Sequence, residues 1–227
     1  MRKNAFRIIC LGDSLTLGIP FGELDRWPTQ LALALEKKWP GKFSVYNRGS
    51  NGATARDALA RLDGEIGWLL PALVLVAFGV NEAGMPSWRR TASVGVDQFR
   101  SDLREIHRYV AGKGGQTAFI AEHEPAPDNR PDGQKTYVPG NGRTYRENYL
   151  PYHQAVLEVA RELKAPLIDI PAQMKAHQVK TESLVVEDGL HLTLDGNAFY
   201  ANAVFDGIHP LLSSLPPSSK NAAAALV

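Results

Sequence analysis

The chain has 227 residues, 44% of them apolar and 22% charged, which are proportions typical of a globular protein with a substantial core. Its 25 basic and 24 acidic residues leave a formal net charge of +1, which gives no electrostatic basis for binding nucleic acid or a membrane surface. The single cysteine excludes an intrachain disulfide, and the first apolar run is too short for a signal peptide or a membrane span.

The first quarter of the chain alternates between strand and helix patterns. Phe6–Leu11 is a short apolar run that ends at a Gly-Asp pair, and we predict a buried strand there. Trp27–Trp39 has apolar residues at helical spacing and ends before Pro-Gly. A second strand is predicted at Phe43–Tyr46, followed by a polar loop at Asn47–Gly52 and a helix at Ala53–Leu62.

The middle of the chain continues the alternation. Ala72–Phe78 is almost wholly apolar, as expected of a central strand that is buried on both faces. A loop at Gly79–Ser93 leads to an amphipathic helix at Val94–Gly112 and a fourth strand at Thr117–Ala121. The segment Glu122–Thr144 is rich in Pro, Gly and Asp, and it exceeds the usual connector length, so it is predicted to be a functional flap.

The last third completes the pattern with a helix at Tyr145–Leu163, a strand at Pro166–Ile170 and a closing helix at Asp195–Leu212. We therefore expect one domain over residues 1–213, with a central parallel sheet of about five strands covered by helices on both faces. Residues 214–227 are low in complexity and are expected to be a disordered tail, with a vector-derived end as one interpretation. We expect a cytoplasmic protein, and a removed leader is the alternative.

Polar residues follow several predicted strands at the edge where a doubly wound sheet binds ligands. Ser14 follows the first strand, Asn81 the third, and Asp188 and His191 precede the last helix. Ester cleavage needs a nucleophile, a base, a group that orients the base, and donors for the oxyanion. Ser14 can be the nucleophile, His191 the base and Asp188 its orienting acid, since an imidazole titrates near neutral pH.

Three donors are candidates for the oxyanion. They are the Asn81 side-chain amide, the Gly52 backbone N–H, which no side chain obstructs, and the Ser14 N–H. The spacing of the chain's cysteine, histidines and carboxylates predicts no metal site.

These segments resemble the four sequence blocks of the SGNH hydrolases, also called the GDSL esterases and lipases. The blocks are residues 12–15 (Gly-Asp-Ser-Leu), 47–54, 79–81 (Gly-Val-Asn) and 188–191 (Asp-Gly-Leu-His), in the family's order. The resemblance covers about residues 6–210. It implies a three-layer α/β/α flavodoxin-like fold and a Ser-His-Asp triad that hydrolyses small acyl, acetyl-sugar, thioester or lipid esters without a cofactor.

One residue departs from the family pattern, and one position of the second block has two candidates. Glu82 stands where the family commonly has Asp, and we expect it to support the loop of Asn81 more than the reaction. In the second block, Gly49 competes with Gly52 as the oxyanion glycine. Asp13 is expected to brace the loop of Ser14, and together with His123 it is a candidate for the substrate pocket.

Other residues near this edge carry two interpretations each. An aromatic and methionine rim for the substrate, or ordinary loop packing, would account for Trp27, Met85, Trp88, Tyr137 and Tyr145. Arg56 could meet an anionic substrate, although a solvated helix face is the better interpretation. The expected partner is a small ester, with a short acyl group or an acetylated carbohydrate favoured by the polar loops; the sequence does not predict an oligomeric state.

Two rival functions remain at this stage. An acyltransferase would use the same triad and deliver the acyl group to an alcohol in place of water. A non-catalytic flavodoxin-like module would bind phosphate or a nucleotide at the loop after the first strand. The second rival matches neither of the common glycine-rich phosphate motifs and leaves Asp188 and His191 unexplained. An α/β-hydrolase is disfavoured because the chain has no Gly-x-Ser-x-Gly elbow.

Overall fold

The computed structural model describes residues 5–84, 91–127 and 141–213. Its sheet has five strands, all parallel, in the order β2-β1-β3-β4-β5. The strands are β1 (Phe6–Gly12), β2 (Phe43–Gly49), β3 (Leu73–Ala77), β4 (Gln116–Ala121) and β5 (Leu167–Asp169). This is the flavodoxin strand order, which confirms the predicted fold class and the number of strands.

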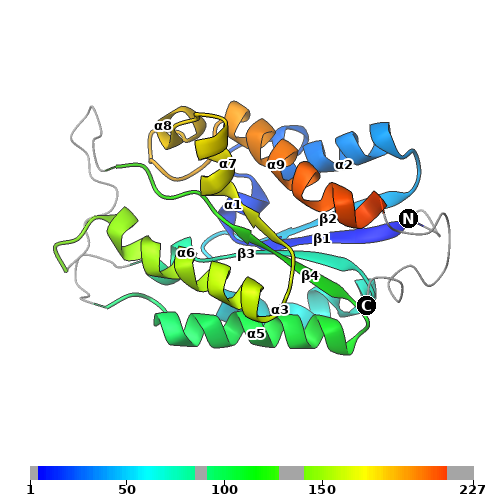
Figure 1. Ribbon diagram of the computed structural model, residues 1–227, viewed down its shortest axis with the longest axis horizontal. Helices are drawn as coiled ribbons and strands as arrows, with labels where there is room; N and C mark the ends of the chain where they lie inside the picture. The colour runs from blue at the N-terminus through cyan, green and yellow to red at the C-terminus, as the bar shows by residue number, and fades with distance from the viewer. Residues whose placement is uncertain (1–4, 85–90, 128–140, 214–227) are drawn as a thin grey trace.

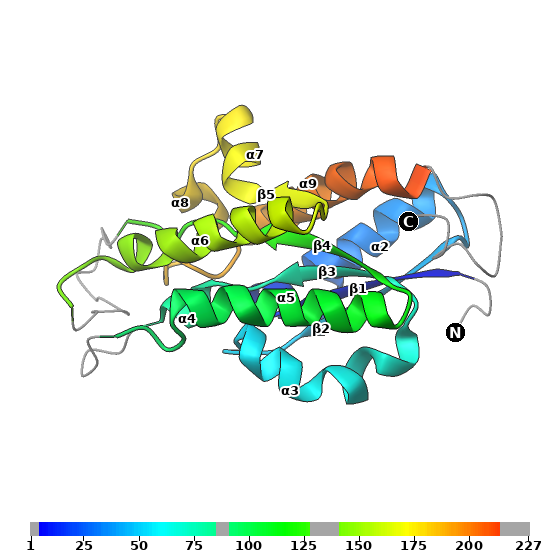
Figure 2. The same cartoon turned by 60° about the horizontal axis from the view of Figure 1, so that its bottom comes forward.

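Helices cover both faces of the sheet, as Figures 1 and 2 show. One layer contains α2 (Trp27–Lys38), α7 (Ile170–Ala176), α8 (Thr181–Leu184) and α9 (Leu194–Ser213). The other contains α3 (Ala55–Ile66), α5 (Val96–Gly112) and α6 (Tyr145–Glu162). Shorter elements are α1 (Ser14–Leu17), α4 (Val80–Ala83) and the 3-10 helices η1 (Glu23–Asp25) and η2 (Gly67–Leu69).

The core is divided into two halves by the two-residue period of the strands. Ile9 of β1 and Val74 of β3 pack with α3, α5 and α6, whereas their neighbours Ile8 and Leu75 pack with α2 and α9. Cys10 belongs to the second half and is fully buried, and this burial raises the pKa of its thiol. The strands β1, β3 and β4 therefore form a rigid base whose carboxyl ends carry the loops described below.

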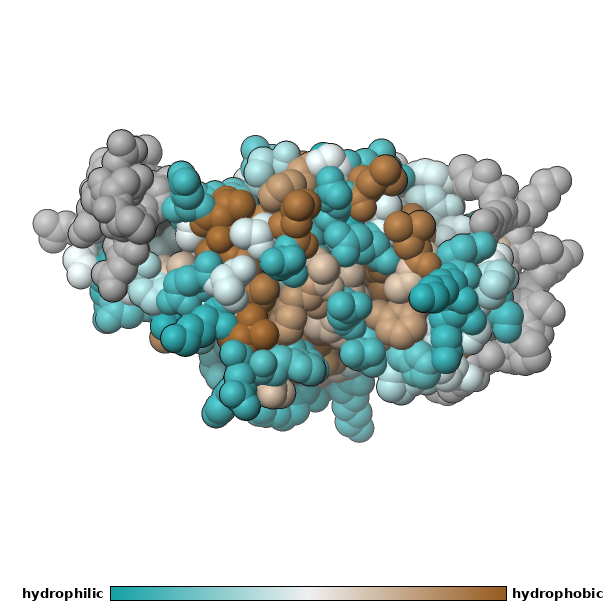
Figure 3. Space-filling model, turned by 90° about the horizontal axis from the view of Figure 1, so that it is seen from above, coloured by the Kyte–Doolittle hydropathy of each residue, from teal (hydrophilic) through white to brown (hydrophobic). Residues whose placement is uncertain are grey.

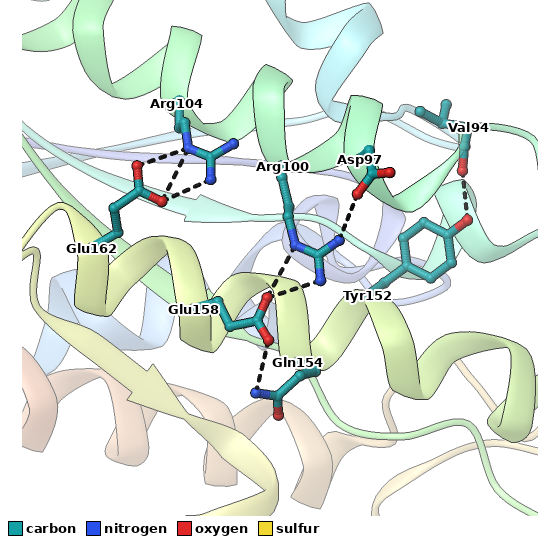
Figure 4. Close-up of polar contacts among 8 residues, drawn as sticks. All are labelled: Val94, Asp97, Arg100, Arg104, Tyr152, Gln154, Glu158 and Glu162. Atoms are coloured by element: carbon teal, nitrogen blue, oxygen red, sulfur yellow. Dashed lines mark hydrogen bonds and ion pairs between the residues drawn. The ribbon is translucent and has the colours of Figure 1, made fainter.

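Helices α5 and α6 lie side by side and are joined by ion pairs along their solvent edge (Figure 4). The Arg100 guanidinium contacts Glu158 at 2.8 Å and the Arg104 guanidinium contacts Glu162 at 2.7 Å. Exposed pairs of this kind each contribute about 0–1 kcal/mol, so the buried apolar side chains hold the two helices on the sheet. To the right of these pairs in Figure 4, the Tyr152 hydroxyl of α6 donates to the Val94 carbonyl at 2.5 Å.

The outer face of the α2/α7/α8/α9 layer mixes apolar and polar side chains (Figure 3). Leu33 of α2 and Leu194 of α9 are exposed there, and Leu24 of η1 is 75% exposed. None of the helices in the described ranges combines the length and the apolar character that are needed to cross a membrane.

Several boundaries differ from the prediction. The strand predicted at Phe43–Tyr46 continues to Gly49, because Asn47 and Arg48 stay in register with Cys10 and Leu11 of β1 although their side chains are polar. The loop predicted at Gly79–Ser93 contains α4, and α7 and α8 were not predicted. These short helices have too few turns to show a helical period in the sequence.

The remaining expectations fall on parts of the chain that lie outside the described residues. They are the predicted tail, residues 214–227, and the central part of the predicted flap, residues 128–140.

Candidate active site

Ser14 lies at the carboxyl end of β1, where the strand passes directly into α1. Asp13 caps this short helix, because its Oδ1 atom accepts a hydrogen bond from the Leu15 N–H at 2.8 Å. Behind the turn, a Cβ atom at Gly12 would lie 2.7 Å from the Ala77 carbonyl oxygen of the neighbouring strand. The strand end therefore needs glycine, and the turn presents Ser14 at the sheet edge as the sequence predicts.

His191 lies on a tight loop between α8 and α9. An antiparallel bridge pairs Val185 with Leu192 and closes the loop at its base. Inside the loop, the Asp188 Oδ1 atom accepts the backbone N–H groups of Leu190 at 2.8 Å and His191 at 2.9 Å. Gly189 adopts a positive φ of 73°, a left-handed conformation that suits glycine, so the Asp-Gly pair makes the turn possible.

The loop brings together the three residues that the sequence assigns to catalysis. The His191 Nε2 atom lies 2.9 Å from Ser14 Oγ, and its Nδ1 atom lies 2.5 Å from Asp188 Oδ2. The hydrogen bond that His191 donates to Asp188 raises the pKa of His191. Burial alone would raise the pKa of the Asp188 carboxyl, but the bonds that it accepts lower this pKa to about 2. An imidazole held in this way can accept a proton from the serine hydroxyl.

The three candidate oxyanion donors differ in their present partners. The Gly52 N–H donates to no atom of the described residues, and a Cβ atom at this position would meet nothing within 4 Å. The N–H of Gly49, by contrast, donates to Asn47 Oδ1, and a Cβ atom there would lie 2.6 Å from Leu17 Cα. Gly52 is therefore the open glycine of the second block, and Gly49 is a packing glycine.

Asn81 of α4 donates both protons of its side-chain amide within the protein. One goes to Asp13 Oδ2 at 2.9 Å and the other to the Ala53 carbonyl at 3.1 Å. Asn81 therefore joins the first, second and third sequence blocks through one amide group. An incoming oxyanion has to replace one of these acceptors before this amide can bind it.

Asp13 and His123, the two candidates for the substrate pocket, are both fully buried. Asp13 is occupied by Leu15 and Asn81, and both ring nitrogens of His123 have protein partners. Neither side chain therefore lines a substrate pocket in this structure. Asp13 braces the loop of Ser14, as expected, and His123 lies behind the loop of His191.

The other residues singled out in the sequence are mostly structural. Trp27 is buried, and its indole N–H donates to the Leu15 carbonyl at 3.0 Å, which ties α2 to α1. The Tyr145 hydroxyl donates to the Val80 carbonyl at 2.6 Å. Arg56 pairs with Asp102 at 2.8 Å on the surface of α3, in agreement with a solvated helix face. Met85, Trp88 and Tyr137 lie outside the described residues.

Sequence reasoning missed a cluster of buried carboxyl groups behind the site, made of Asp13, Glu82 and Glu122. Glu82 Oε1 accepts the Ala55 N–H at 2.6 Å and so holds the start of α3, which agrees with its expected supporting role. Among the described residues, neither oxygen of Glu122 has a hydrogen-bond partner within normal geometry. The cluster could have been predicted from acidic residues that directly follow apolar strands, as Glu122 follows β4.

Burial sets the protonation of this cluster. It raises the pKa of Glu82 to about 8 and that of Asp13 to about 7, although the Leu15 amide and His191 oppose the rise at Asp13. Burial raises the pKa of Glu122 well above its ordinary range, and Asp13 and Glu82 add to this effect against a smaller opposition from the Val80 amide. Asp13 has the most hydrogen-bond donors of the three, so it is best placed to carry the negative charge.

No group of three or more His, Cys, Asp or Glu side chains within residues 5–84, 91–127 and 141–213 is arranged to hold a metal ion. The expectation of chemistry without a cofactor stays a prediction.

The chain is similar to known proteins in its sequence and in its fold. The profile of the GDSL-like Lipase/Acylhydrolase family matches residues 10–199. The "Isoamyl acetate-hydrolyzing esterase 1 homolog" of Mus musculus is 28% identical over 220 residues, which are 92% of this chain and 84% of the relative. The human protein of that name is 26% identical over 216 residues, with the same coverage.

Two solved structures show the same fold. The lipase/acylhydrolase from Enterococcus faecalis superposes with a TM-score of 0.74 at 21% identity, over 91% of this chain and 96% of that one. Axe2, an acetylxylan esterase from Geobacillus stearothermophilus, superposes with a TM-score of 0.71 at 20% identity, over 92% of this chain and 96% of that one.

The buried carboxyl cluster predicts an unusual pH dependence of stability. A carboxyl group whose pKa is higher in the folded than in the unfolded protein stabilises the fold at low pH, and this contribution is lost as the pH rises from the unfolded to the folded pKa. We expect the free energy of unfolding to fall between about pH 5 and pH 8, by roughly 1 kcal/mol per pH unit for each such group. Urea titrations at several pH values across this range measure the free energy of unfolding.

Glu122→Gln should flatten this slope, because glutamine imitates the protonated side chain. Glu105→Gln, which changes an exposed glutamate of α5, is the matched control and should keep the slope of the unmodified protein. Equal slopes in the three proteins would contradict the assignment of a neutral, buried Glu122.

Proposed function

The chain belongs to the GDSL-like lipase/acylhydrolase family and is a carboxylic ester hydrolase, and from that premise we propose that Ser14, His191 and Asp188 form its catalytic triad. In this proposal Ser14 is the nucleophile, His191 the general base and Asp188 the acid that orients the base. The substrate is a small ester with a short acyl group.

One observation carries the proposal. Ser14 and His191 lie 177 residues apart in the sequence, yet Ser14 Oγ and His191 Nε2 are 2.9 Å apart, with Asp188 on the far side of the ring. A hydroxyl, an imidazole and a carboxylate in this order are the arrangement that activates a serine. Family membership sets aside the alternative of a non-catalytic phosphate-binding module, which gives these contacts no role.

In the acylation step, Ser14 Oγ attacks the ester carbonyl carbon while His191 Nε2 takes the hydroxyl proton. The carbonyl π electrons move to its oxygen and form a tetrahedral oxyanion. When this intermediate collapses, the bond to the leaving alcohol breaks and His191 returns the proton to the alcohol oxygen. Ser14 then carries the acyl group, and the carboxylate of Asp188 stabilises the imidazolium formed during the step.

Deacylation repeats the sequence with water. His191 Nε2 accepts a proton from water as its oxygen attacks the acyl carbon. The tetrahedral intermediate collapses with release of the carboxylic acid, and Ser14 Oγ recovers the proton from His191. Each proton removed in the two steps is returned, so the enzyme ends in its starting state.

The proposed oxyanion donors are the Ser14 N–H, the Gly52 N–H and the Asn81 amide. Asn81 already holds two acceptors, and its bond to the Ala53 carbonyl is the longer and involves a neutral oxygen. We expect the oxyanion to replace the Ala53 carbonyl as the acceptor of this N–H, because a charged acceptor forms the stronger hydrogen bond. Asp13 keeps the other proton and so holds the amide in place.

The substrate class follows from two supports. The polar character of the loops at 79–93 and 122–144 favours a small acyl group over a long lipid chain. Relatives named for isoamyl acetate hydrolysis and for acetylxylan hydrolysis point in the same direction, because both names specify acetyl esters. We therefore propose acetate esters of small alcohols or of sugars.

Ser14→Ala should lower kcat on p-nitrophenyl acetate by at least about 10⁴-fold, because it removes the nucleophile, and His191→Ala should lose nearly as much without the losses adding. A fluorophosphonate should label the unmodified protein at Ser14, as read by mass spectrometry. Ser101→Ala, which changes an exposed serine of α5, is the control and should keep full activity. Full esterase activity in Ser14→Ala would refute the proposed triad.

Asn81→Ala should lower kcat by about 10²–10³-fold and leave KM within a few-fold, because the oxyanion exists in the transition state and not in the bound ester. Steady-state kinetics on p-nitrophenyl acetate measure both constants, and circular dichroism checks that the variant is folded. A rise in KM at constant kcat would show that Asn81 binds the substrate and would remove it from the oxyanion site.

A chain-length series tests the substrate class. We expect kcat/KM to be highest for p-nitrophenyl acetate and to fall through butyrate and octanoate to palmitate. Isoamyl acetate and acetylated xylooligosaccharides, assayed by acetate release, should distinguish alcohol esters from sugar esters. Parallel assays of Ser14→Ala subtract spontaneous hydrolysis. A maximum at octanoate or palmitate would contradict the short-acyl proposal without affecting the triad.

A further inference from the structure

His123, the second residue after β4, lies completely buried with every polar atom of its ring bonded. Its Nε2 atom is 2.8 Å from the Leu190 carbonyl oxygen, and its Nδ1 atom is 2.5 Å from the Tyr200 hydroxyl of α9. The same hydroxyl accepts the backbone N–H of His123 at 3.0 Å. The imidazole thus connects β4, α9 and the loop of His191.

These partners define the tautomer of His123. A carbonyl oxygen accepts hydrogen bonds and never donates, so Nε2 carries the proton that Leu190 receives. In a neutral ring Nδ1 is then an acceptor, and the Tyr200 hydroxyl donates to it. Burial lowers the pKa of His123 to about 4, which keeps the ring neutral at physiological pH. The network is therefore complete and has one orientation.

The Leu190 carbonyl belongs to the peptide group that directly precedes His191. Its hydrogen bond to His123 constrains the orientation of that peptide. A second contact acts in parallel, because the Ala126 N–H donates to the Gly189 carbonyl at 2.8 Å. The segment that leaves β4 therefore supports two consecutive carbonyl groups of the loop that carries His191.

We infer that His123 is a positioning residue for ester hydrolysis, which holds the Leu190 carbonyl and thereby aims the His191 imidazole at Ser14. The inference rests on the proposed role of His191 as the base. His123 cannot itself reach a substrate, because it is buried and both ring nitrogens are bonded. Misplacement of a reacting group by about 1 Å can cost about 10²-fold in rate, so a second support for the loop has a catalytic effect.

Two substitutions separate the contact with Leu190 from the contact with Tyr200. The amide nitrogen of His123→Gln can reach the position of Nε2 and donate to Leu190. The shorter side chain of His123→Asn reaches the position of Nδ1 and can accept from Tyr200, but it leaves the Leu190 carbonyl without its donor. Both variants keep a polar group in the buried site, which favours correct folding.

We expect His123→Asn to lower kcat on p-nitrophenyl acetate by about 10–100-fold at unchanged KM, and His123→Gln to restore kcat to within a few-fold of the unmodified protein. The acid limb of the kcat/KM–pH profile should move to lower pH in His123→Asn, because a loosened loop weakens the Asp188–His191 bond that raises the pKa of His191. The titratable groups that face His191 are Asp188 on its own loop, Asp13 after β1 and His123 after β4.

Tyr152→Phe is the matched control, since it removes a tyrosine hydroxyl that donates to a backbone carbonyl far along the sequence from the His191 loop. It should lower Tm and leave kcat and the pH profile unchanged. A His123→Asn variant with the kcat and pH profile of the unmodified protein would overturn the inference, whatever its Tm. Ser14→Ala and His191→Ala, assayed beside it, separate a failure of the proposed triad from a failure of the positioning role. If these two variants remain active, the proposed triad fails. If they are inactive while His123→Asn is fully active, only the positioning role fails.

Discussion

The arrangement of the candidate active site depends on the hydrogen bonds that the Asp13 carboxylate accepts at the carboxyl ends of the strands. One of its oxygens caps the helix that begins with Ser14, and the other accepts the amide of Asn81. Because both partners are donors, the two bonds favour the charged carboxylate at a fully buried position where burial alone would make it neutral. The segments that follow β1 and β3 are thus joined by a single side chain, in addition to the pairing of the two strands. A shift of either strand end would break the bond and leave a buried charge without a partner.

The base is held by a different part of the chain. The loop of His191 closes on itself through Asp188 and the bridge between Val185 and Leu192, so its internal shape is local. Its position relative to Ser14 is set from outside, by α9 and by the segment after β4. Local turns define a loop's shape, but contacts with the sheet define where it lies, and the reaction needs both.

Helix α6 contributes a further constraint through its tyrosines. Tyr145 and Tyr149 donate their hydroxyl protons to the carbonyls of Val80 and Glu122, at the ends of β3 and β4. These bonds satisfy backbone groups that are left over where strands end, at places where burial would otherwise leave them without partners. The acidic cluster nearby has the opposite character, because no hydrogen-bond donor within the described residues is recorded for the Glu122 carboxyl oxygens and burial raises the pKa of this group well above its ordinary range. The edge therefore combines hydrogen-bonded groups at the strand ends with buried carboxyl groups whose pKa values are raised by burial.

The sequence by itself determined the fold class and the five strands, because hydrophobic periodicity and turn chemistry are local properties of the chain. The four blocks were found by their resemblance to a known family, because their order and their residues can be read directly from the chain. It also indicated that Glu82 supports a loop. Only the tertiary structure showed that Gly52 has open space beside it and Gly49 does not, because Leu17 fills the space beside Gly49. The same holds for Asn81, whose protons are both occupied, and for His123, which moved from a candidate pocket residue to the support of the His191 loop. In each case the decisive partner is distant in the sequence, and burial and hydrogen bonding between distant segments leave no periodic trace in the order of residues.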